Sequence, residues 1–185
     1  MKGFKKLFAV LLALCFVVGL SPKTSAASTT KILEADVEFD TRHGHYFYVE
    51  GNSNRYLNMY TDSIPTSRTK VTTWTKEENN ATQAWDIGYL SNGKFIIVVN
   101  NNRTLAIDFD RNYDTPQVQL YSWVNDYYDD VVMSKGIYGV NSVEPIKLAN
   151  RSSYLNVTNT NTGVYDVNGK VCVWNSTPTY WVHLA

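Results

Sequence analysis

This sequence has few cysteines and no surplus of positive charge. Cys15 lies in an N-terminal apolar segment, and Cys172 is the only other cysteine among the 185 residues. One cysteine outside that segment excludes an intramolecular disulfide, and its place between Val171 and Val173 predicts a buried, inert thiol. The 17 basic residues only equal the 17 acidic ones. Because nucleic-acid binding needs clustered Lys and Arg, we expect no nucleic-acid partner.

Long apolar runs are equally scarce. The longest covers residues 7–20, follows three lysines and precedes a small-residue stretch that ends at Ala27. This order is typical of a secretory signal peptide and resembles the leaders of bacterial exports, so residues 1–27 are predicted to be removed and the protein to be secreted and extracellular. The run is shorter than the roughly 20 residues that a membrane-spanning helix needs, and we expect no membrane span. The leader holds four of the basic residues and no acidic one, which leaves residues 28–185 acidic.

Motifs for catalysis and metal binding are missing as well. The sequence has no Gly-x-Ser-x-Gly elbow, no His-Glu-x-x-His motif, no phosphate-binding loop and no active-site cysteine signature. His43 and His45 are close in sequence, but no cysteine or acidic pair accompanies them at ligand spacing. We therefore expect neither an enzyme nor a bound metal or cofactor. One alternative stays open, in which two carboxylates such as Asp108 and Asp130 act as acid and base in glycoside cleavage.

Short runs rich in Val, Ile, Thr, Tyr and Trp fill most of the chain. They alternate with Asn, Gly, Asp and Ser clusters about every ten residues, and helical signals are nearly absent. This pattern predicts an all-β domain. Asn92-Gly93 and Asn168-Gly169 are predicted to form tight type I′ turns, since Asn and Gly best tolerate the positive φ that both central residues need.

One pattern occurs three times, at a spacing of about 48 to 50 residues. Each copy has a strand with a central Leu, a Val-x-x-aromatic strand and a terminal triplet. The copies read Arg55-Tyr56-Leu57-Asn58-Met59, Val71-Thr72-Thr73-Trp74 and Gln83-Ala84-Trp85; then Arg103-Thr104-Leu105-Ala106-Ile107, Val118-Gln119-Leu120-Tyr121 and Asp130-Val131-Val132; then Ser153-Tyr154-Leu155-Asn156-Val157, Val171-Cys172-Val173-Trp174 and Thr179-Tyr180-Trp181. Further strands are predicted ahead of each Leu, at residues 46–49, 95–99 and 146–148.

Four strands in each of three copies predict an all-β fold of twelve strands, a β-trefoil with three pseudo-threefold repeats. One copy alone leaves its apolar face uncovered, whereas three copies around an axis bury it together. A β-propeller has repeats of similar length, but three blades are too few. We expect a single domain over residues 28–185, with repeats at roughly 45–92, 93–142 and 143–185.

The terminal triplet carries a family resemblance. Gln83-Ala84-Trp85, with Val71-Thr72-Thr73-Trp74 upstream, resembles the Gln-x-Trp repeat of ricin-B-type lectin domains, and the resemblance extends from about Tyr46 to Ala185. It implies structural roles for the repeat residues, in which a Trp ring fills the space between copies and donates its N–H to a backbone acceptor. The residues concerned are Trp74, Gln83, Trp85, Trp174 and Trp181.

The resemblance also implies a sugar pocket inside one copy. Such a pocket has an Asp three residues after the repeat Leu, a polar residue and an aromatic two apart in the next strand, and an Asn or similar group before the triplet. A carboxylate accepts two neighbouring hydroxyls, and an aromatic face packs on the apolar face of a sugar. Copy two fits best, with Asp108, Gln119, Tyr121, Asp129 and Asp130. Copies one and three have Tyr60 and Thr158 at the Asp position, so neither is expected to retain the full pocket.

An ordinary surface role for Asp108, and a solvated acidic loop at residues 126–130, are the alternatives to this pocket. With the pocket, the chain is predicted to be a secreted carbohydrate-binding module that recognises a glycan or cell-surface polysaccharide. One pocket binds weakly, which implies an oligomer or a toxin or hydrolase partner that this domain targets. The alternative function is a protein-binding trefoil, a toxin component or enzyme inhibitor, that uses its long loops at residues 61–70 and 158–169.

Overall fold

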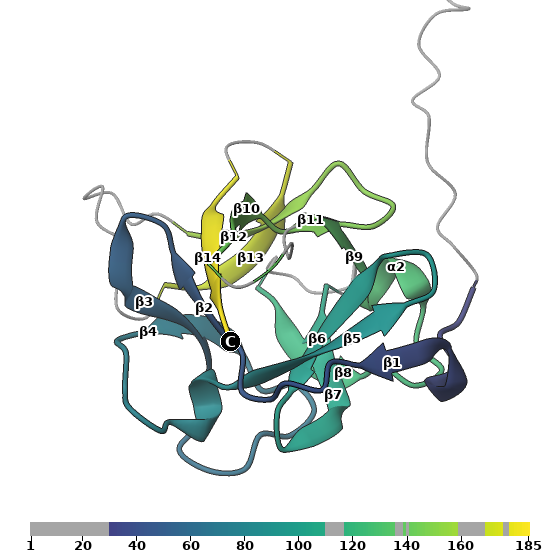
Figure 1. The fold of residues 1–185 in the computed structure, drawn as a ribbon, viewed down its shortest axis with the longest axis horizontal. Coiled ribbons are helices and arrows are strands. Elements are labelled where there is room, and N and C mark those ends of the chain that lie inside the picture. Colours follow the sequence, from purple (N-terminus) through teal and green to yellow (C-terminus); the bar gives the residue numbers. More distant parts are fainter. Residues whose placement is uncertain (1–29, 110–116, 136–138, 140, 159–168, 176–177) are drawn as a thin grey trace, which may run out of the picture.

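The computed structural model describes residues 30–109, 117–135, 139, 141–158, 169–175 and 178–185 (Figure 1). The predicted signal peptide and most of the predicted loop 158–169 lie outside these ranges. The repeat strands are β2 (Tyr46–Val49), β3 (Asn52–Met59), β4 (Val71–Trp74) and β5 (Trp85–Leu90); β6 (Phe95–Val99), β7 (Asn102–Asp108), β8 (Gln119–Ser122) and β9 (Met133–Lys135); β11 (Lys147–Leu148), β12 (Tyr154–Val157), β13 (Val171–Trp174) and β14 (Tyr180–Leu184). The predicted number of twelve repeat strands is thus confirmed, but the last strand of copy two lies at Met133–Lys135 rather than at the predicted triplet 130–132, most of which belongs to a short helix.

Five short elements complete the described part of the chain. They are η1 (Glu34–Asp36), β1 (Val37–Phe39), η2 (Ala81–Gln83), α2 (Tyr128–Val131) and β10 (Val143–Pro145). Strand β1 pairs with β5, and β10 pairs with β14, so both extend the sheets of the repeats.

Three antiparallel hairpins, β3–β4, β7–β8 and β12–β13, meet at one end of the molecule. Val71, Val118 and Val171, the axis valines, lie one in each hairpin and are at most 1% exposed. The amide of Val71 donates to the carbonyl of Val118, whose own amide donates to Val171, at 2.9 Å each. Bridges between neighbouring residues of the three hairpins repeat the same contact around a pseudo-threefold axis.

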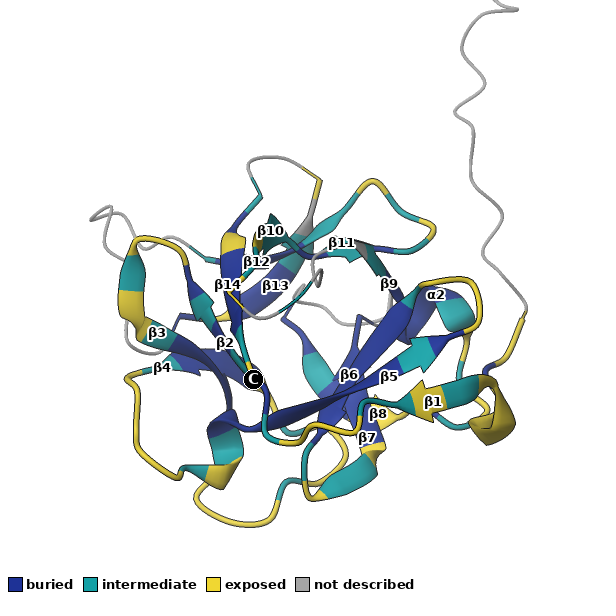
Figure 2. Cartoon of the chain, in the orientation of Figure 1, coloured by how far each residue is buried: buried dark blue, intermediate teal, exposed yellow. Residues whose placement is uncertain are grey.

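The other six repeat strands form a barrel. Around the barrel, β14 pairs with β2, β5 with β6, β6 with β9, and β9 with β11, while a bridge between His45 and Trp85 joins β2 to β5. The main core lies inside, and its apolar side chains come from all three repeats. Figure 2 shows the strands mostly buried and the loops around them exposed. No repeat covers its apolar face alone, which is why the pattern needs three copies.

A second, smaller core lies under the N-terminal segment, residues 30–39, here called the strap. Ile32 is 1% exposed and packs with Trp123, Val131 and Val132. The Ile32 amide donates to Asp126 at 3.1 Å, and its carbonyl accepts from Asn125 at 2.9 Å. The strap ends in β1, which pairs with β5, and its first residues cover part of repeat two (Figure 1).

The turn between β5 and β6 differs from the prediction in type. Only Gly93 of the Asn92-Gly93 pair has positive φ, at 74°. The Gly93 amide donates to Leu90 at 3.0 Å, and Leu90 in turn donates to Lys94 at 2.8 Å. This is a three-residue loop with a type I turn followed by a left-handed glycine, rather than the two-residue type I′ turn. Asn168-Gly169 lies partly outside the described residues.

Candidate functional site

The two Trp residues of the terminal triplets are buried in the main core. Trp85 and Trp181 are both 0% exposed. Their indole N–H groups donate to the carbonyls of Leu57 and Leu155 at 3.1 and 2.9 Å. In repeat two, the strand that pairs with β11 begins at Met133, and this buried methionine takes the Trp position. The predicted triplet places that position one residue earlier, at Val132.

Gln83 fixes the connection between β4 and β5. It is fully buried, its Nε2 donates to the carbonyl of Thr75 at 2.7 Å, and its Oε1 accepts from the amide of Glu77 at 3.1 Å. Farther along, the Asn80 side chain caps η2 by accepting from the amide of Thr82 at 2.8 Å. The connection is thereby held against the end of β3, with Glu77 and Asn80 on its exposed side.

A cavity of about 380 Å³ opens between this connection and the β3–β4 hairpin of repeat one. Its wall is formed by Trp74, which is half-buried, and Tyr60, which is 58% exposed. The Trp74 indole donates to Oε1 of Glu77 at 2.9 Å, and Asn80 donates to Oε2 at 2.6 Å. The remaining lining residues are Asn58, Thr61, Asp62 and Thr82. The sequence predicted no full pocket in this repeat, yet the cavity lies where the resemblance puts one.

The cavity combines the groups that recognise hydroxyl-rich molecules. Asn58 is 5% exposed; its amide donates to the Met59 carbonyl at 3.0 Å, and its oxygen accepts from the Thr82 hydroxyl at 2.9 Å. The polar floor is thus pre-oriented. The carboxylates of the lining accept hydrogen bonds from hydroxyl groups, amides donate and accept them, and the aromatic wall offers an apolar face. Asp62 and Glu77 were missed because they lie in loops that the repeat pattern does not constrain, while Asn80 fits the polar position expected before the triplet.

The hairpin registers decide which residues of the three repeats correspond. The axis valines pair with Met59 in repeat one and with Val157 in repeat three. In repeat two Asp108 pairs with Gln119, so the next pair in the ladder joins Phe109 to the axis valine. Phe109 therefore corresponds to Met59 and Val157.

It follows that Asp108 corresponds to Asn58 and Asn156. The three side chains are 2, 5 and 0% exposed. The predicted alignment of repeat two on Leu105 is therefore wrong by two residues, because Ile107 occupies the central Leu position. The interpretation of Asp108 as a surface residue is also wrong, since its side chain is buried.

The predicted pocket of repeat two is only partly brought together. Gln119 and Tyr121 lie two apart on β8 and face the same side, Asp108 is the strand partner of Gln119, and Tyr121 is 40% exposed. The position three residues after Ile107 is Asp110, which lies outside the described residues. The five predicted residues stay a prediction as a sugar site.

Asp129 and Asp130 bind the neighbouring repeat. Both belong to α2 and are 6% exposed. Asp129 accepts from the Asn150 amide at 2.6 Å, and Asp130 pairs with Arg151 at 2.8 Å. The backbone carbonyl of Asp130 also accepts from Phe109 at 2.7 Å. The alternative of a solvated acidic loop is therefore wrong for these two residues, because they tie α2 to the turn between β11 and β12.

Several solved structures share this architecture. A designed 3-fold symmetric protein, ThreeFoil, superposes with a TM-score of 0.59 and 14% identity, over 77% of this chain and 99% of its own. The C-half of an earthworm R-type lectin, solved in complex with GalNAc, has a TM-score of 0.55 and 16% identity, over 77% of this chain and 98% of its own. A mosquitocidal holotoxin has a TM-score of 0.60 and 14% identity, over 78% of this chain and 17% of its own.

The chain is a β-trefoil. The predicted fold class is thus confirmed. No family model and no curated protein matches the trefoil's sequence, so the likeness is one of structure. Among the residues described here, no helix is long and apolar enough to cross a membrane.

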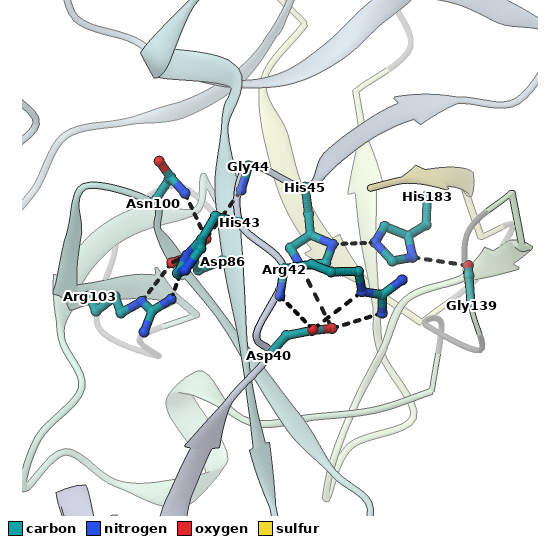
Figure 3. Close-up of polar contacts among 10 residues, drawn as sticks. All are labelled: Asp40, Arg42, His43, Gly44, His45, Asp86, Asn100, Arg103, Gly139 and His183. Carbon is teal, nitrogen blue, oxygen red and sulfur yellow. Dashed lines mark hydrogen bonds and ion pairs between the residues drawn. The ribbon is translucent and has the colours of Figure 1, made fainter.

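A polar cluster of the trefoil, separate from the cavity, is centred on Asp86 (Figure 3). This carboxylate is fully buried and accepts from Asn100 at 2.7 Å, Arg103 at 2.6 Å and the amide of Gly44 at 3.3 Å, with His43 Nδ1 at 3.3 Å. Burial by itself raises the pKa of Asp86, but these hydrogen bonds outweigh burial and hold it below its ordinary value. The cluster fastens the segment before β2 to repeat two.

The other two histidines form a buried pair beside this cluster (Figure 3). His45 Nδ1 lies 2.9 Å from His183 Nε2, and His183 Nδ1 lies 3.0 Å from the Gly139 carbonyl. Since a carbonyl only accepts, His183 carries its proton on Nδ1 and His45 donates to its Nε2. Asp40, paired with Arg42 at 2.8 Å, lies 3.8 Å from His45 Nε2. None of the described residues forms a cluster of three or more His, Cys, Asp or Glu suited to a metal.

Proposed function

We propose that this protein is a secreted carbohydrate-binding module and that its sugar site is the repeat-one cavity. The observation that carries the proposal is the pre-oriented combination of Trp74, Glu77 and Asn80 on a polar floor, in a hollow of about 380 Å³. Sugar sites need an apolar face together with a few fixed hydrogen-bonding groups, and this cavity supplies both. The GalNAc complex of the earthworm lectin, which shares the fold, supports carbohydrate as the ligand class.

Each lining group has a role in this proposal. The Trp74 ring packs on the C–H face of one sugar, and Tyr60 covers its edge. Asn80 and Thr82 hydrogen-bond to hydroxyls from the side of η2, and Asp62 accepts from hydroxyls at the rim. Glu77 keeps the indole and the Asn80 amide in place, because one of its oxygens is bound to each.

The wider context also belongs to the proposal. Residues 1–27 direct export, and a toxin or hydrolase partner supplies the activity that this module targets. The mosquitocidal holotoxin supports a partnership of this kind, since the similar part makes up 17% of its chain. Binding rather than catalysis is assigned to the domain itself.

The test compares two aromatic residues at equivalent positions. Trp74 and Tyr121 both lie three residues after an axis valine, one in repeat one and the other in repeat two. A glycan array identifies the ligand, and titration calorimetry measures its affinity for Trp74→Ala and Tyr121→Ala. We expect the Trp74 variant to lose about tenfold or more in affinity, because the stacking face is gone, and the Tyr121 variant to bind as the wild type does.

The reverse result would move the site to repeat two. Wild-type affinity in both variants would reject a site at either aromatic residue, and an array without any bound glycan would reject the function. Circular dichroism checks that each variant remains folded.

A second function is favoured by one observation. Ile64 is 81% exposed and lies with Tyr60 on the long loop of repeat one, where apolar side chains suit a protein partner. The protein would then act as a toxin component or enzyme inhibitor. Affinity capture from culture supernatant separates the two functions, since this one requires a stoichiometric protein partner whose binding is lost in Ile64→Ser.

A further inference from the structure

The repeat-one cavity continues into a larger hollow. The second cavity has a volume of about 720 Å³ and shares five lining residues with the first. These are Thr61, Asp62, Glu77, Asn80 and Thr82. From there it extends past Ile64 and Pro65 on one side and reaches Asn101 and Asn102 of repeat two on the other. The two hollows form one groove that runs from the Trp74 wall to the turn between β6 and β7.

The volume of this groove exceeds that of one sugar ring. At the roughly 30 Å³ that a water molecule takes in the liquid, the twelve non-hydrogen atoms of a hexose fill at most about 360 Å³. The cavity beside Trp74 therefore has room for one ring, and the larger hollow has room for more. Asn101 and Asn102 supply amide groups at its far end. The groove is suited to an oligosaccharide.

The charged side chains that line the groove are all negative among the described residues. They are Asp62, Glu77 and Glu78, and no described Lys, Arg or His lines either cavity. The ion pairs found among the described residues involve none of these three carboxylates. Lys76 lies over the Tyr56 ring, 5.9 Å from its centroid, and borders a separate smaller hollow that Glu77 and Glu78 also reach. Uncompensated carboxylates in a concave site concentrate cations and repel anions.

We propose that the natural ligand is an oligosaccharide whose rings carry free ammonium groups. This inference rests on the proposed function and adds the ligand class. One ring packs on Trp74, the next ring extends toward Asn101 and Asn102, and Asp62 and Glu78 pair with the ammonium groups from the two sides of the groove. Glu77 is occupied in holding Trp74 and Asn80, so the preference depends on Asp62 and Glu78, for which the structure shows no side-chain hydrogen bond among the described residues.

The experiment compares four tetramers by titration calorimetry with the wild-type protein: β-1,4-linked glucosamine, its fully N-acetylated form, cellotetraose and tetralysine. We expect the glucosamine tetramer to bind about tenfold more tightly than cellotetraose at low salt, and this advantage to shrink as salt is raised. In the Asp62→Asn/Glu78→Gln double variant the two sugars should bind alike. A control double variant, Glu34→Gln/Glu38→Gln, loses the same charge from exposed strap residues that line neither cavity, and should keep the preference.

The possible outcomes test the ammonium preference separately from the proposed carbohydrate binding. Equal or stronger binding of cellotetraose or the N-acetylated tetramer would overturn the ammonium preference and leave the sugar site standing. Tetralysine binding as tightly as the glucosamine tetramer would overturn the inference too, since charge alone would then suffice. Binding of none of the three sugars, here and on the array, would reject the proposed function itself. Loss of the preference in the control variant would show that overall charge causes it.

Discussion

At the scale of single residues, Asn58, Asp108 and Asn156 occupy one buried position in all three repeats. In repeats one and three the side chain ties its strand to the segment ahead of the buried Trp. Asn58 accepts from the Thr82 hydroxyl at 2.9 Å, and Asn156 accepts from the Thr179 amide at 2.6 Å. The position thus uses its side-chain oxygen as an acceptor, which an amide and a carboxylate both provide.

We therefore predict that Asp108→Asn is tolerated and Asp108→Ala is not. The amide keeps the acceptor and the volume, and we expect a change in the free energy of unfolding within about 1 kcal/mol. The alanine variant leaves buried partners unsatisfied and should lose about 1–3 kcal/mol. Urea denaturation measures both. Equal destabilisation by the two variants would mean that the negative charge of Asp108 is itself required.

The repeat period could be predicted from the sequence, but the register of repeat two could not. Leu105 and Ile107 are both apolar and lie on the same face of one strand, so either fits the central Leu position. The turns before these strands match at a spacing of 50 residues, as Asn52 and Asn102 show, whereas the axis valines of the two repeats are 47 apart. The loops between the two hairpin strands therefore differ in length, and this difference is why the sequence pattern placed repeat two in the wrong register. The acidic groups of the groove escaped prediction because loop residues follow no period.

At the scale of elements, the connection between β4 and β5 is held from within by one side chain. Gln83 does not line either cavity, yet it fixes the backbone at Thr75 and at Glu77. The position of Glu77 in turn sets that of the Trp74 indole. In the other repeats the Gln two residues before the buried Trp position is replaced, by Val131 in repeat two and Thr179 in repeat three, so this way of holding the connection belongs to repeat one.

Gln83→Ala should therefore weaken sugar binding, although Gln83 itself does not contact the sugar. We expect a loss of about 1–3 kcal/mol in stability, because the backbone groups of Thr75 and Glu77 lose their buried side-chain partner, together with a lower affinity measured on the folded protein. Calorimetry at a temperature well below the melting point checks the affinity. Ser122→Ala, on the exposed end of β8, is the control and should alter neither quantity. Unchanged affinity in Gln83→Ala would show that the groove orders itself independently of this residue.

The strap is the element that the repeat pattern did not predict. It lies before the first copy, and only Ile32 of its first residues is buried. Ile32→Ala should cost about 2–4 kcal/mol in the free energy of unfolding, because it removes a side chain that fills the smaller core. Its neighbour Leu33 is 53% exposed, and Leu33→Ala should change stability by less than about 0.5 kcal/mol. Equal effects in denaturant titrations would mean that the strap contributes no packing.

At the scale of the whole molecule, the buried histidine pair joins the two ends of the trefoil. His45 precedes β2, His183 lies on β14, and Gly139 comes from the connection between repeats two and three. Burial lowers the pKa of both histidines, with Asp40 acting against this on each. For Asp40 the hydrogen bond from Arg42 lowers the pKa to about 2. Neutral histidines and ionised aspartates are thus the forms that the folded protein favours.

Stability should accordingly fall in two steps on acidification. Histidines with a lowered pKa in the folded state bind more protons when unfolded, so their contribution is complete above pH of about 6.5 and is lost below it. Asp40 and Asp86, whose pKa values are also lowered, contribute above pH of about 4 and lose this contribution as the pH falls toward about 2. Urea denaturation between pH 8 and 3 measures the curve, and nuclear magnetic resonance titration of the imidazole protons assigns the first step. His43, whose side chain is 62% exposed, provides the control, since His43→Gln should leave that step in place. A flat curve between pH 7 and 5, or imidazole signals of His45 and His183 that titrate as free histidine does, would contradict the neutral pair.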